Sequence, residues 1–524
     1  MNASSQNLTP FLLIVTLIIW CLSYMWKRRK LYYHAWSVPG PLALPLIGSA
    51  YVFFDKPTDT VKKIIALIPR YPDLMRMWFG RQLIYFVTEP EHVEKVLTSQ
   101  KCLAKHDLYR FMICSTGTGL LTAPTEKWRR QRKIITPSFG RKLLLDTFVN
   151  IFVERANVFN EVIESCRDRK DQQLFKRLYQ LSFNIICETG AGLKTDILRQ
   201  QNEYFDLLAH IEKLSEITEM RVCTVWHHFE WTWRFYAKSK EFDKSLTEFR
   251  KITSNIIKNK IELVDKEDKH KDNSLLARIE EDETRRNLIL LDAILVSSNY
   301  TKEELRDEIN TFLAAGTETT ATTTFFLFTM LGVFSDVQVS ARKDFCSDNT
   351  TTLSFQQKIY EEVMEILGED RQVETSDLSN FKYMERVIKE TLRLFPVGVL
   401  FLRTAEDDID LGKYVLPKGA GACISVLNIH RNPKYWPDPL RFDPDRFLPE
   451  EVAKRHPCTY VPFSYGPRNC VGYRHGMMNM KTVTATVLRK FRVLTDYKSV
   501  EDVEVVTKMM LKPKDGFKVY LQLR

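Results

Sequence analysis

The apolar and polar positions of the chain first set its N-terminus apart. Residues Phe11 to Trp26 are 16 positions without a charge, and the basic run Lys27-Arg28-Arg29-Lys30 follows directly. As a helix this stretch would measure ~24 Å, less than the ~30 Å hydrocarbon core of a bilayer but extendable at either end. Because basic residues stay on the cytosolic side, the pattern predicts a single-pass anchor over residues 1–30, with the remaining chain in the cytosol.

Beyond this stretch the pattern predicts two helices and a β-like end. A long apolar helix is expected from Thr301, since Thr301 and Glu304 fit a capping box. A second helix is expected over Met384 to Phe395, and a β-like segment over Val505 to Leu523.

Two further stretches predict connections. Residues 31–50 include Pro39-Gly40-Pro41 and predict a stiff hinge before one globular domain over 51–524. Lys258 to Arg286 carries dense charge of both signs, which predicts a mobile surface connection between helices.

Residues 339–356 have no helical period. Gln338-Val339-Ser340 can be encoded by a splice-donor consensus, and Phe355-Gln356 by an acceptor. We therefore interpret residues 339–356 as a retained intron in the gene model. The alternative is a genuine surface loop, since each doubling of loop length costs only ~0.6 kcal/mol.

Composition narrows the class of protein. Hydrophobic residues make up 44% and charged residues 27%, as in an ordinary globular protein. The net charge of +10 is concentrated in short basic runs, and no nucleic-acid motif accompanies it, so a membrane surface and an acidic redox partner explain it better than nucleic acid. The ten cysteines lack metal-finger spacing, which predicts reduced thiols.

One decapeptide carries the chemistry, Phe463-Ser-Tyr-Gly466-Pro-Arg468-Asn-Cys470-Val-Gly472. A cysteine between glycines can hold a redox-active iron, since glycines let backbone N–H groups approach the sulfur. Arg468 offers a planar fork for a carboxylate. A lone cysteine in this setting is more often a buried structural thiol. The combination of five residues in this decapeptide favours a metal ligand instead: Phe463, Gly466, Arg468, Cys470 and Gly472.

This string resembles the haem-binding loop of the cytochromes P-450, whose cysteine-thiolate ligation is a known family property. The resemblance implies a mainly α fold with small β-sheets, an N-terminal transmembrane anchor and a haem b whose axial thiolate is Cys470. Within the family the chain looks most like the clan of the family 4 fatty-acid hydroxylases, as an insect-like member. Several of that clan carry a glutamate where this chain has Ala315, so non-covalent haem is expected.

Three further motifs fit the resemblance. Glu390 and Arg393 share a helix face, and in the family such a pair joins a later arginine, here Arg446, in a buried charge cluster. In Ala315-Gly-Thr-Glu-Thr-Thr320, the resemblance makes Thr319 the oxygen-activating alcohol and Glu318 its acidic neighbour, against ordinary back-bonding of threonine to the helix.

The third motif is Trp128 with Arg132, four residues apart on one helix face, so that both side chains could reach haem propionates. Arg403 matches a further propionate-binding arginine of the family. The charges around them are read either as a docking face for an electron-donor protein or as a solvated helix face.

The resemblance implies a monooxygenase of the endoplasmic reticulum membrane. It would insert one atom of O₂ into a lipophilic substrate, in a pocket lined by residues 105–118, 205–231 and 397–401. No dinucleotide fingerprint is present, so electrons would come from NADPH through a separate cytochrome P-450 reductase, with cytochrome b5 as a second donor. Two other classes stay open, a peroxide isomerase that needs no reductase and a ligand-sequestering haem protein.

Overall fold

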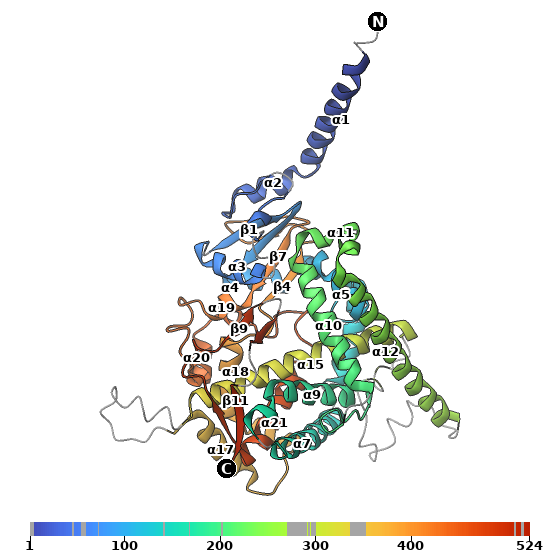
Figure 1. Cartoon of the computed structure of the whole chain (residues 1–524). Coiled ribbons are helices and arrows are strands. Elements are labelled where there is room, and N and C mark those ends of the chain that lie inside the picture. Colours follow the sequence, from blue (N-terminus) through green and yellow to red (C-terminus); the bar gives the residue numbers. More distant parts are fainter. Residues whose placement is uncertain are drawn as a thin grey trace.

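The computed structural model has a helical body, a sheet at one end and one helix that projects from it (Figure 1). It describes the following residues: 5–44, 47–53, 59–71, 73–139, 142–166, 168–200, 203–269, 291, 294, 300–335, 353–507, 510–514 and 518–524. The mainly α architecture with small sheets confirms the expected fold class.

The largest sheet contains strands from both halves of the chain. Its strand order is β1-β2-β7-β4-β3, with β2 parallel to β7 and the other neighbours antiparallel. The strands are β1 (Leu74–Phe79), β2 (Gln82–Val87), β3 (Ala104–Lys105), β4 (Leu400–Thr404) and β7 (Gly421–Ser425). Three two-stranded ladders pair β5 (Ile409–Asp410) with β6 (Val415–Leu416), β8 (Phe491–Thr495) with β11 (Val519–Leu523), and β9 (Val505–Thr507) with β10 (Leu511–Pro513). The last two ladders confirm the β-like end of the chain.

The helices of the body pack around α15 (Lys302–Val333), which crosses its middle (Figure 1). The N-terminal half of the chain supplies α3 (Thr60–Leu67), α4 (Pro90–Thr98), α5 (Arg110–Thr116), α6 (Thr125–Ser138), α7 (Lys142–Glu164), α8 (Arg169–Gln172), α9 (Leu174–Ile186), α10 (Glu203–Cys223), α11 (Glu230–Phe235) and α12 (Ala237–Lys269). The C-terminal half adds α17 (Phe355–Leu367), α18 (Lys382–Leu394), α19 (Val426–His430), α20 (Pro449–Ala453) and α21 (Tyr473–Lys490).

Helix α15 begins where the sequence predicts. The Thr301 hydroxyl accepts the Glu304 N–H at 3.2 Å, and the Glu304 carboxylate accepts the Thr301 N–H at 3.1 Å, which confirms the capping box. Its C-terminal half is buried on all sides, and Phe325 to Phe328 lie in the main core. At Gly316 the helix lies against α9, because a Cβ there would come within 2.7 Å of the Ile186 side chain.

The N-terminal helix α1 (Ser5–Lys27) projects from the sheet end, and α2 (Arg29–Trp36) follows it. Within the part of the chain that the structure describes, no helix is both long and apolar enough to be a candidate membrane span. The transmembrane anchor expected over residues 1–30 is therefore not confirmed.

Residues 31–44, within the expected stiff hinge, pack against the body. Leu31, Ala35 and Val38 are buried in a core cluster with β1 and β2. The Arg76 N–H donates to the Pro39 carbonyl at 2.9 Å, and a Cβ on Gly40 would overlap the Arg76 carbonyl. The prolines and glycine thus lay this segment flat on the sheet.

Two other predicted segments lie partly outside the described residues. Of the connection expected at Lys258 to Arg286, residues 258–269 continue helix α12 and residues 270–286 are not described. Of the suspected insertion, residues 339–352 are not described, whereas Ser354 caps helix α17 and Gln356 is buried, bonding the Val493 carbonyl and N–H at 3.1 Å each. Residues 353–356 therefore belong to the fold.

Candidate functional site

The loop before helix α21 holds Cys470 in a fixed backbone conformation. The Cys470 N–H donates to the Phe463 carbonyl at 2.9 Å, and the Phe463 ring meets the Tyr473 ring edge-on at 4.9 Å. Gly466 has φ +71°, and a Cβ there would lie 2.2 Å from the Leu97 carbonyl oxygen. Only glycine fits this turn, because both the backbone angle and the space exclude a side chain.

The Cys470 side chain is accessible although protein surrounds it. Its surface is exposed, yet burial raises the pKa of its thiol, against the opposing effects of the Gly472 N–H and the Arg132 charge. A group can show both properties when it borders an internal cavity. The thiolate would need a positively charged partner there, which an iron ion provides.

Helix α6 brings Trp128 and Arg132 against this loop. The Arg132 guanidinium donates to the Asn469 backbone carbonyl at 2.8 Å and to its side-chain oxygen at 2.6 Å. The Trp128 ring is buried, and the Arg468 guanidinium lies 4.4 Å from its centre. Both residues therefore contact the cysteine loop, as their spacing on one helix face allows.

Three cations gather beside the loop, on Arg468, Arg403 and Lys105. Burial and the Arg403 charge lower the pKa of Arg468 to about 9. Burial, with the charges of Arg403 and Arg468, lowers the pKa of Lys105 well below its ordinary value. Lys105 and Arg403 are direct cross-strand partners on β3 and β4, a pairing that is unfavourable for like charges unless an anion joins them.

None of these cations forms an ion pair with a carboxylate of the described residues, although Glu406 is near enough to act on the pKa of Arg468. Arg468 donates to the Ala123 carbonyl at 2.9 Å, but its Nε and Nη1 atoms are buried without a hydrogen-bond partner among the described residues. An accessible thiol beside unpaired cations fits a metal group that carries carboxylates, and haem with its propionates is such a group. Sequence reasoning missed Lys105 as a member of this set, because only the strand pairing places it opposite Arg403.

In the oxygen-site motif on helix α15, the side chains of Thr319 and Glu318 make different contacts. The Thr319 hydroxyl donates to the Ala315 carbonyl at 2.6 Å, so the back-bonded geometry is the one observed. The Glu318 carboxylate is buried and forms an ion pair with Lys512 of β10. Burial alone would lower the pKa of Lys512, but the charges of Glu318, Glu219 and Glu212 raise it. No pattern in the sequence indicated Lys512.

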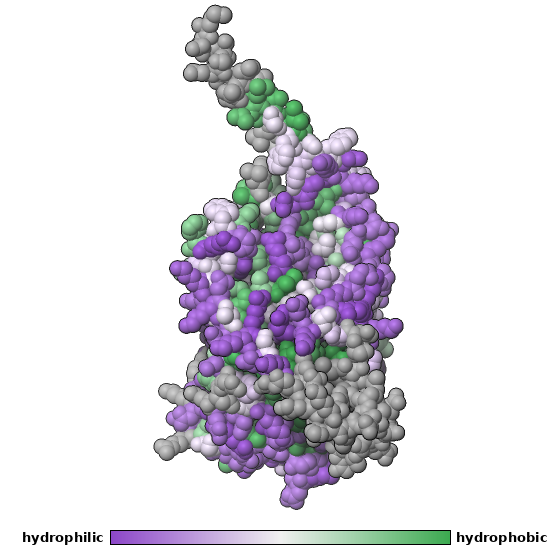
Figure 2. Space-filling view, turned by 90° about the vertical axis from the view of Figure 1, so that its right-hand side faces the viewer, coloured by the Kyte–Doolittle hydropathy of each residue, from purple (hydrophilic) through white to green (hydrophobic). Residues whose placement is uncertain are grey.

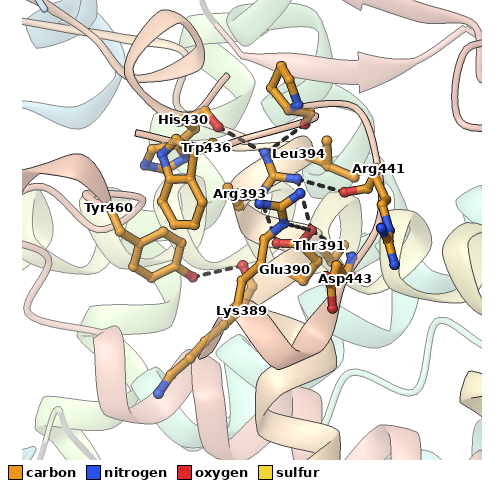
Figure 3. Close-up of polar contacts among 12 residues, drawn as sticks. Lys389, Glu390, Thr391, Arg393, Leu394, His430, Trp436, Arg441, Asp443 and Tyr460 are labelled. Atoms are coloured by element: carbon orange, nitrogen blue, oxygen red, sulfur yellow. Dashed lines mark hydrogen bonds and ion pairs between the residues drawn. The ribbon is translucent and has the colours of Figure 1, made fainter. Parts of the chain in front are cut away.

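The Glu390–Arg393 pair lies in a closed polar network (Figure 3). Both side chains are fully buried and form two contacts, Arg393 Nε to Glu390 Oε2 at 2.7 Å and Nη2 to Oε1 at 2.8 Å. Arg393 also donates to the carbonyls of His430, Pro439 and Arg441. Arg446 Nε lies 3.6 Å from Glu390 Oε1, so the later arginine joins the pair.

A helical fold with an accessible cysteine before a core helix fits a haem-thiolate protein. The Cytochrome P450 family profile matches residues 38–345 and 350–521. The chain belongs to the cytochrome P450 family and is a monooxygenase of that family, whose members bind haem through a cysteine thiolate.

The relatives place the chain near family 4. It is 30% identical to mouse Cytochrome P450 4V2, over 100% of this chain and 96% of the relative. Identity to Cytochrome P450 4c3 of Drosophila melanogaster is 29% (99% and 95% covered), and to Cytochrome P450 4c21 of Blattella germanica 30% (93% of each). These relatives confirm the resemblance to family 4, insect members included. The crystal structure of the cytochrome P450DA heme domain shares the fold, with TM-score 0.72 and 19% identity over 93% of this chain and 98% of that one.

Proposed function

We propose that this protein inserts one oxygen atom from O₂ into a lipophilic small molecule, with electrons from NADPH delivered by a separate reductase. The observation that carries the proposal is the accessible Cys470 thiol beside three cations, Arg468, Arg403 and Lys105, of which Arg468 has two nitrogen atoms buried without a hydrogen-bond partner among the described residues. Bound haem would supply the iron that activates dioxygen, and its thiolate ligand would favour O–O cleavage.

The residues of the chain divide the work of holding the cofactor. Cys470 would ligate the iron of a non-covalent haem b, while Arg468, Arg403 and Lys105 would bind its propionates. The Trp128 ring would position the Arg468 guanidinium that lies over it, and Arg132 would hold the loop through its hydrogen bonds to Asn469. Phe463, Gly466 and Gly472 would shape the backbone around the sulfur. The exposed Ala315 side chain offers no carboxylate for an ester to haem. Denaturation should therefore release free haem, which mass spectrometry detects.

Thr319 and Glu318 would serve proton delivery in different ways. The Thr319 oxygen still has lone pairs while its proton is donated to Ala315, so it can accept a hydrogen bond from the reacting side. Glu318 is held by Lys512 and would deliver a proton only after that ion pair loosens. Glu390, Arg393 and Arg446 would stabilise the core and take no part in the chemistry.

A lipophilic substrate is supported by an apolar cavity under the sheet. Its wall includes Ile64, Phe86, Met112, Val225 and Leu400. Members of the expected ranges 105–118, 205–231 and 397–401 thus line one cavity. The organisation we propose is an anchor over 1–30, a connecting segment over 31–50 and an oxygenase domain over 51–524.

We also propose attachment to the endoplasmic reticulum membrane, with the oxygenase domain in the cytosol. Apolar side chains such as Leu13 and Trp26 are exposed on the projecting helix α1, and Figure 2 shows a green, hydrophobic stretch along this helix. Trp231 and Phe235 of α11 are also exposed, and α11 lies at the same end of the body (Figure 1). Removal of residues 1–30 should shift the protein from the alkali-resistant membrane pellet toward the supernatant; unchanged sedimentation would contradict attachment through α1.

The deciding experiment is the carbon monoxide difference spectrum of the reduced, membrane-expressed protein. We expect the strongly red-shifted band of thiolate-ligated haem, its loss in Cys470→Ser, and its retention in Cys166→Ser, which changes a cysteine outside this loop. An unshifted band in the native protein would contradict Cys470 ligation.

Turnover separates the remaining classes. A monooxygenase consumes NADPH only when purified reductase is added, with cytochrome b5 as a second donor, whereas a peroxide isomerase turns over without either. A substrate-induced spin shift without product would indicate a ligand-sequestering protein.

A further inference from the structure

A second cavity lies beside helix α15, between α5, α10, α12 and strand β10. Its apolar wall includes Met112, Ile211, Leu214, Phe249 and Met510. Ala314 also lines it, one residue before the proposed oxygen-site motif. The cavity therefore borders the place where the reacting end of a substrate would lie.

The polar side chains of this cavity fall into two kinds. On α5, the Ser115 and Thr116 hydroxyls each donate to the Met112 carbonyl at 3.0 Å and are satisfied by their own helix. In contrast, Asn310 Oδ1 and Thr218 Oγ1 are buried without a partner among the described residues, and their side chains are only 2% and 7% exposed. Buried polar atoms are rarely left unpaired, because the loss of water is then uncompensated.

Three acidic side chains and two lysines act on one another beside these two residues. Lys512 lines the cavity and is paired with Glu318, while Glu219 lines it too and Glu212 lies close enough to act on both Lys512 and Glu318. Lys176 is the other cation that acts on Glu212. A carboxylate placed here would compete with Glu318 for Lys512 and face the other two acidic groups, whereas an uncharged polar group would meet no such repulsion.

We propose, on the basis of the monooxygenase function above, that this cavity binds a lipophilic molecule whose inner end carries an uncharged hydroxyl. The hydroxyl donates to Asn310 Oδ1 and bonds the Thr218 hydroxyl, and the hydrocarbon remainder fills the apolar wall. The substrate class is therefore a long-chain or polycyclic alcohol, and the acidic surroundings disfavour a carboxylate at the same place.

The test compares three probes of equal chain length, 1-dodecanol, 1-fluorododecane and dodecanoic acid, binding to the full-length protein. Affinities are measured by titration calorimetry, so the series stands whether or not the carbon monoxide spectrum supports the proposed function. We expect 1-dodecanol to bind about tenfold more tightly than either other probe, because one satisfied pair of buried polar groups is worth about that factor. Equal affinities, as when a water satisfies both residues, or tightest binding of the acid would overturn the proposal.

Variants test which residues give this preference. Thr218→Val and Asn310→Leu should each lower the 1-dodecanol affinity severalfold and leave 1-fluorododecane unchanged. Thr116→Val is the matched control, since it removes a hydroxyl from the same cavity that is already satisfied by Met112. A parallel loss for both probes in the Thr218 and Asn310 variants would show a structural role and contradict the assignment.

Discussion

Two buried arginines, Arg393 and Arg468, show how differently the same side chain is used in this molecule. Arg393 donates five hydrogen bonds, two to Glu390 and three to backbone carbonyls, and its charge has a counter-ion (Figure 3). Arg468 donates one hydrogen bond, to Ala123, and leaves Nε and Nη1 unpaired among the described residues. A satisfied buried charge indicates a structural role, and an unsatisfied one indicates that a ligand completes it.

Breaking the satisfied cluster should have the largest effect. Glu390→Gln removes the only carboxylate that Arg393 contacts in the described ion pairs and leaves its guanidinium without a counter-ion. We expect the free energy of unfolding to fall by about 3–5 kcal/mol, measured by urea denaturation. Asp445→Asn is the control, because the Asp445 side chain in the pair with Arg386 is 65% exposed and its loss should cost less than about 1 kcal/mol. Equal costs for the two variants would contradict the comparison.

The buried carboxyl group of Glu308 has only one of its two oxygens hydrogen-bonded, and it predicts that the stability of the fold depends on pH. Its Oε2 accepts the Leu120 N–H at 3.0 Å, its Oε1 has no partner among the described residues, and burial raises its pKa to about 7. The folded protein therefore keeps a proton that the unfolded chain releases near pH ~4.3. The resulting stability is fully present below that pH and is lost as the pH rises through about 7.

Glu308→Gln should flatten this part of the pH profile. The midpoint of thermal unfolding, measured from about pH 5 to 8, should fall less steeply in the variant than in the native protein. Glu365→Gln on the exposed face of α17 is the control. An unchanged slope in Glu308→Gln would show that this carboxyl is already ionised.

Removing the unsatisfied arginine should spare the fold and weaken cofactor binding. Arg468→Met deletes a buried charge that lacks a counter-ion, so the cofactor-free protein should be as stable as the native one or more stable. Haem retention in a myoglobin-transfer assay should fall at least about tenfold, with partial rescue in Arg468→Lys. A destabilised cofactor-free protein with unchanged haem retention would show that Arg468, like Arg393, has a structural role.

Substitutions of two helix glycines change stability without removing a polar group, and they provide a reference for the effects of the charged residues. Helix α21 contains Gly476, and a Cβ there would meet no atom within 4 Å. Gly476→Ala should raise the free energy of unfolding by about 0.5–1 kcal/mol. Gly316→Ala, whose Cβ would approach Ile186 at 2.7 Å, should instead lower it. Thermal denaturation of the two variants measures both signs.

The smallest effect is expected from deleting residues 339–356. The deletion joins Gln338 to Gln357, so Asp336, Val337 and Gln338 take the places of Ser354, Phe355 and Gln356. An N-cap residue, an apolar residue and the glutamine that bonds Val493 are thus all restored. We expect stability within about 1 kcal/mol of the full chain, since loop length matters little. Loss of folding would support a genuine loop, and sequencing the transcript decides the gene model.

Motif spacing predicted more of this site than local pattern did. The helix repeat predicted that Glu390 lies beside Arg393 and Trp128 beside Arg132, whereas Arg446 and Arg468 were joined to these pairs only through the family resemblance. Lys105 and Lys512 were missed, since strand pairing and a distant ladder bring them to the site. The stiff hinge over residues 31–50 stays a prediction, and the packing of Leu31, Ala35 and Val38 could not be foreseen, because proline restricts the backbone without determining which surface a segment packs against.

The pairing of β2 with β7 has a consequence for biosynthesis. Ile84 lies beside Gly421, which leaves the ribosome about 340 residues later. At roughly 5–20 residues per second, β2 keeps one open edge for about 20–70 s while the helices between the two strands emerge. An open edge of apolar strand invites pairing with other chains. The yield of folded protein is therefore expected to depend on chaperones that cover this edge during translation, and to improve when expression is slow.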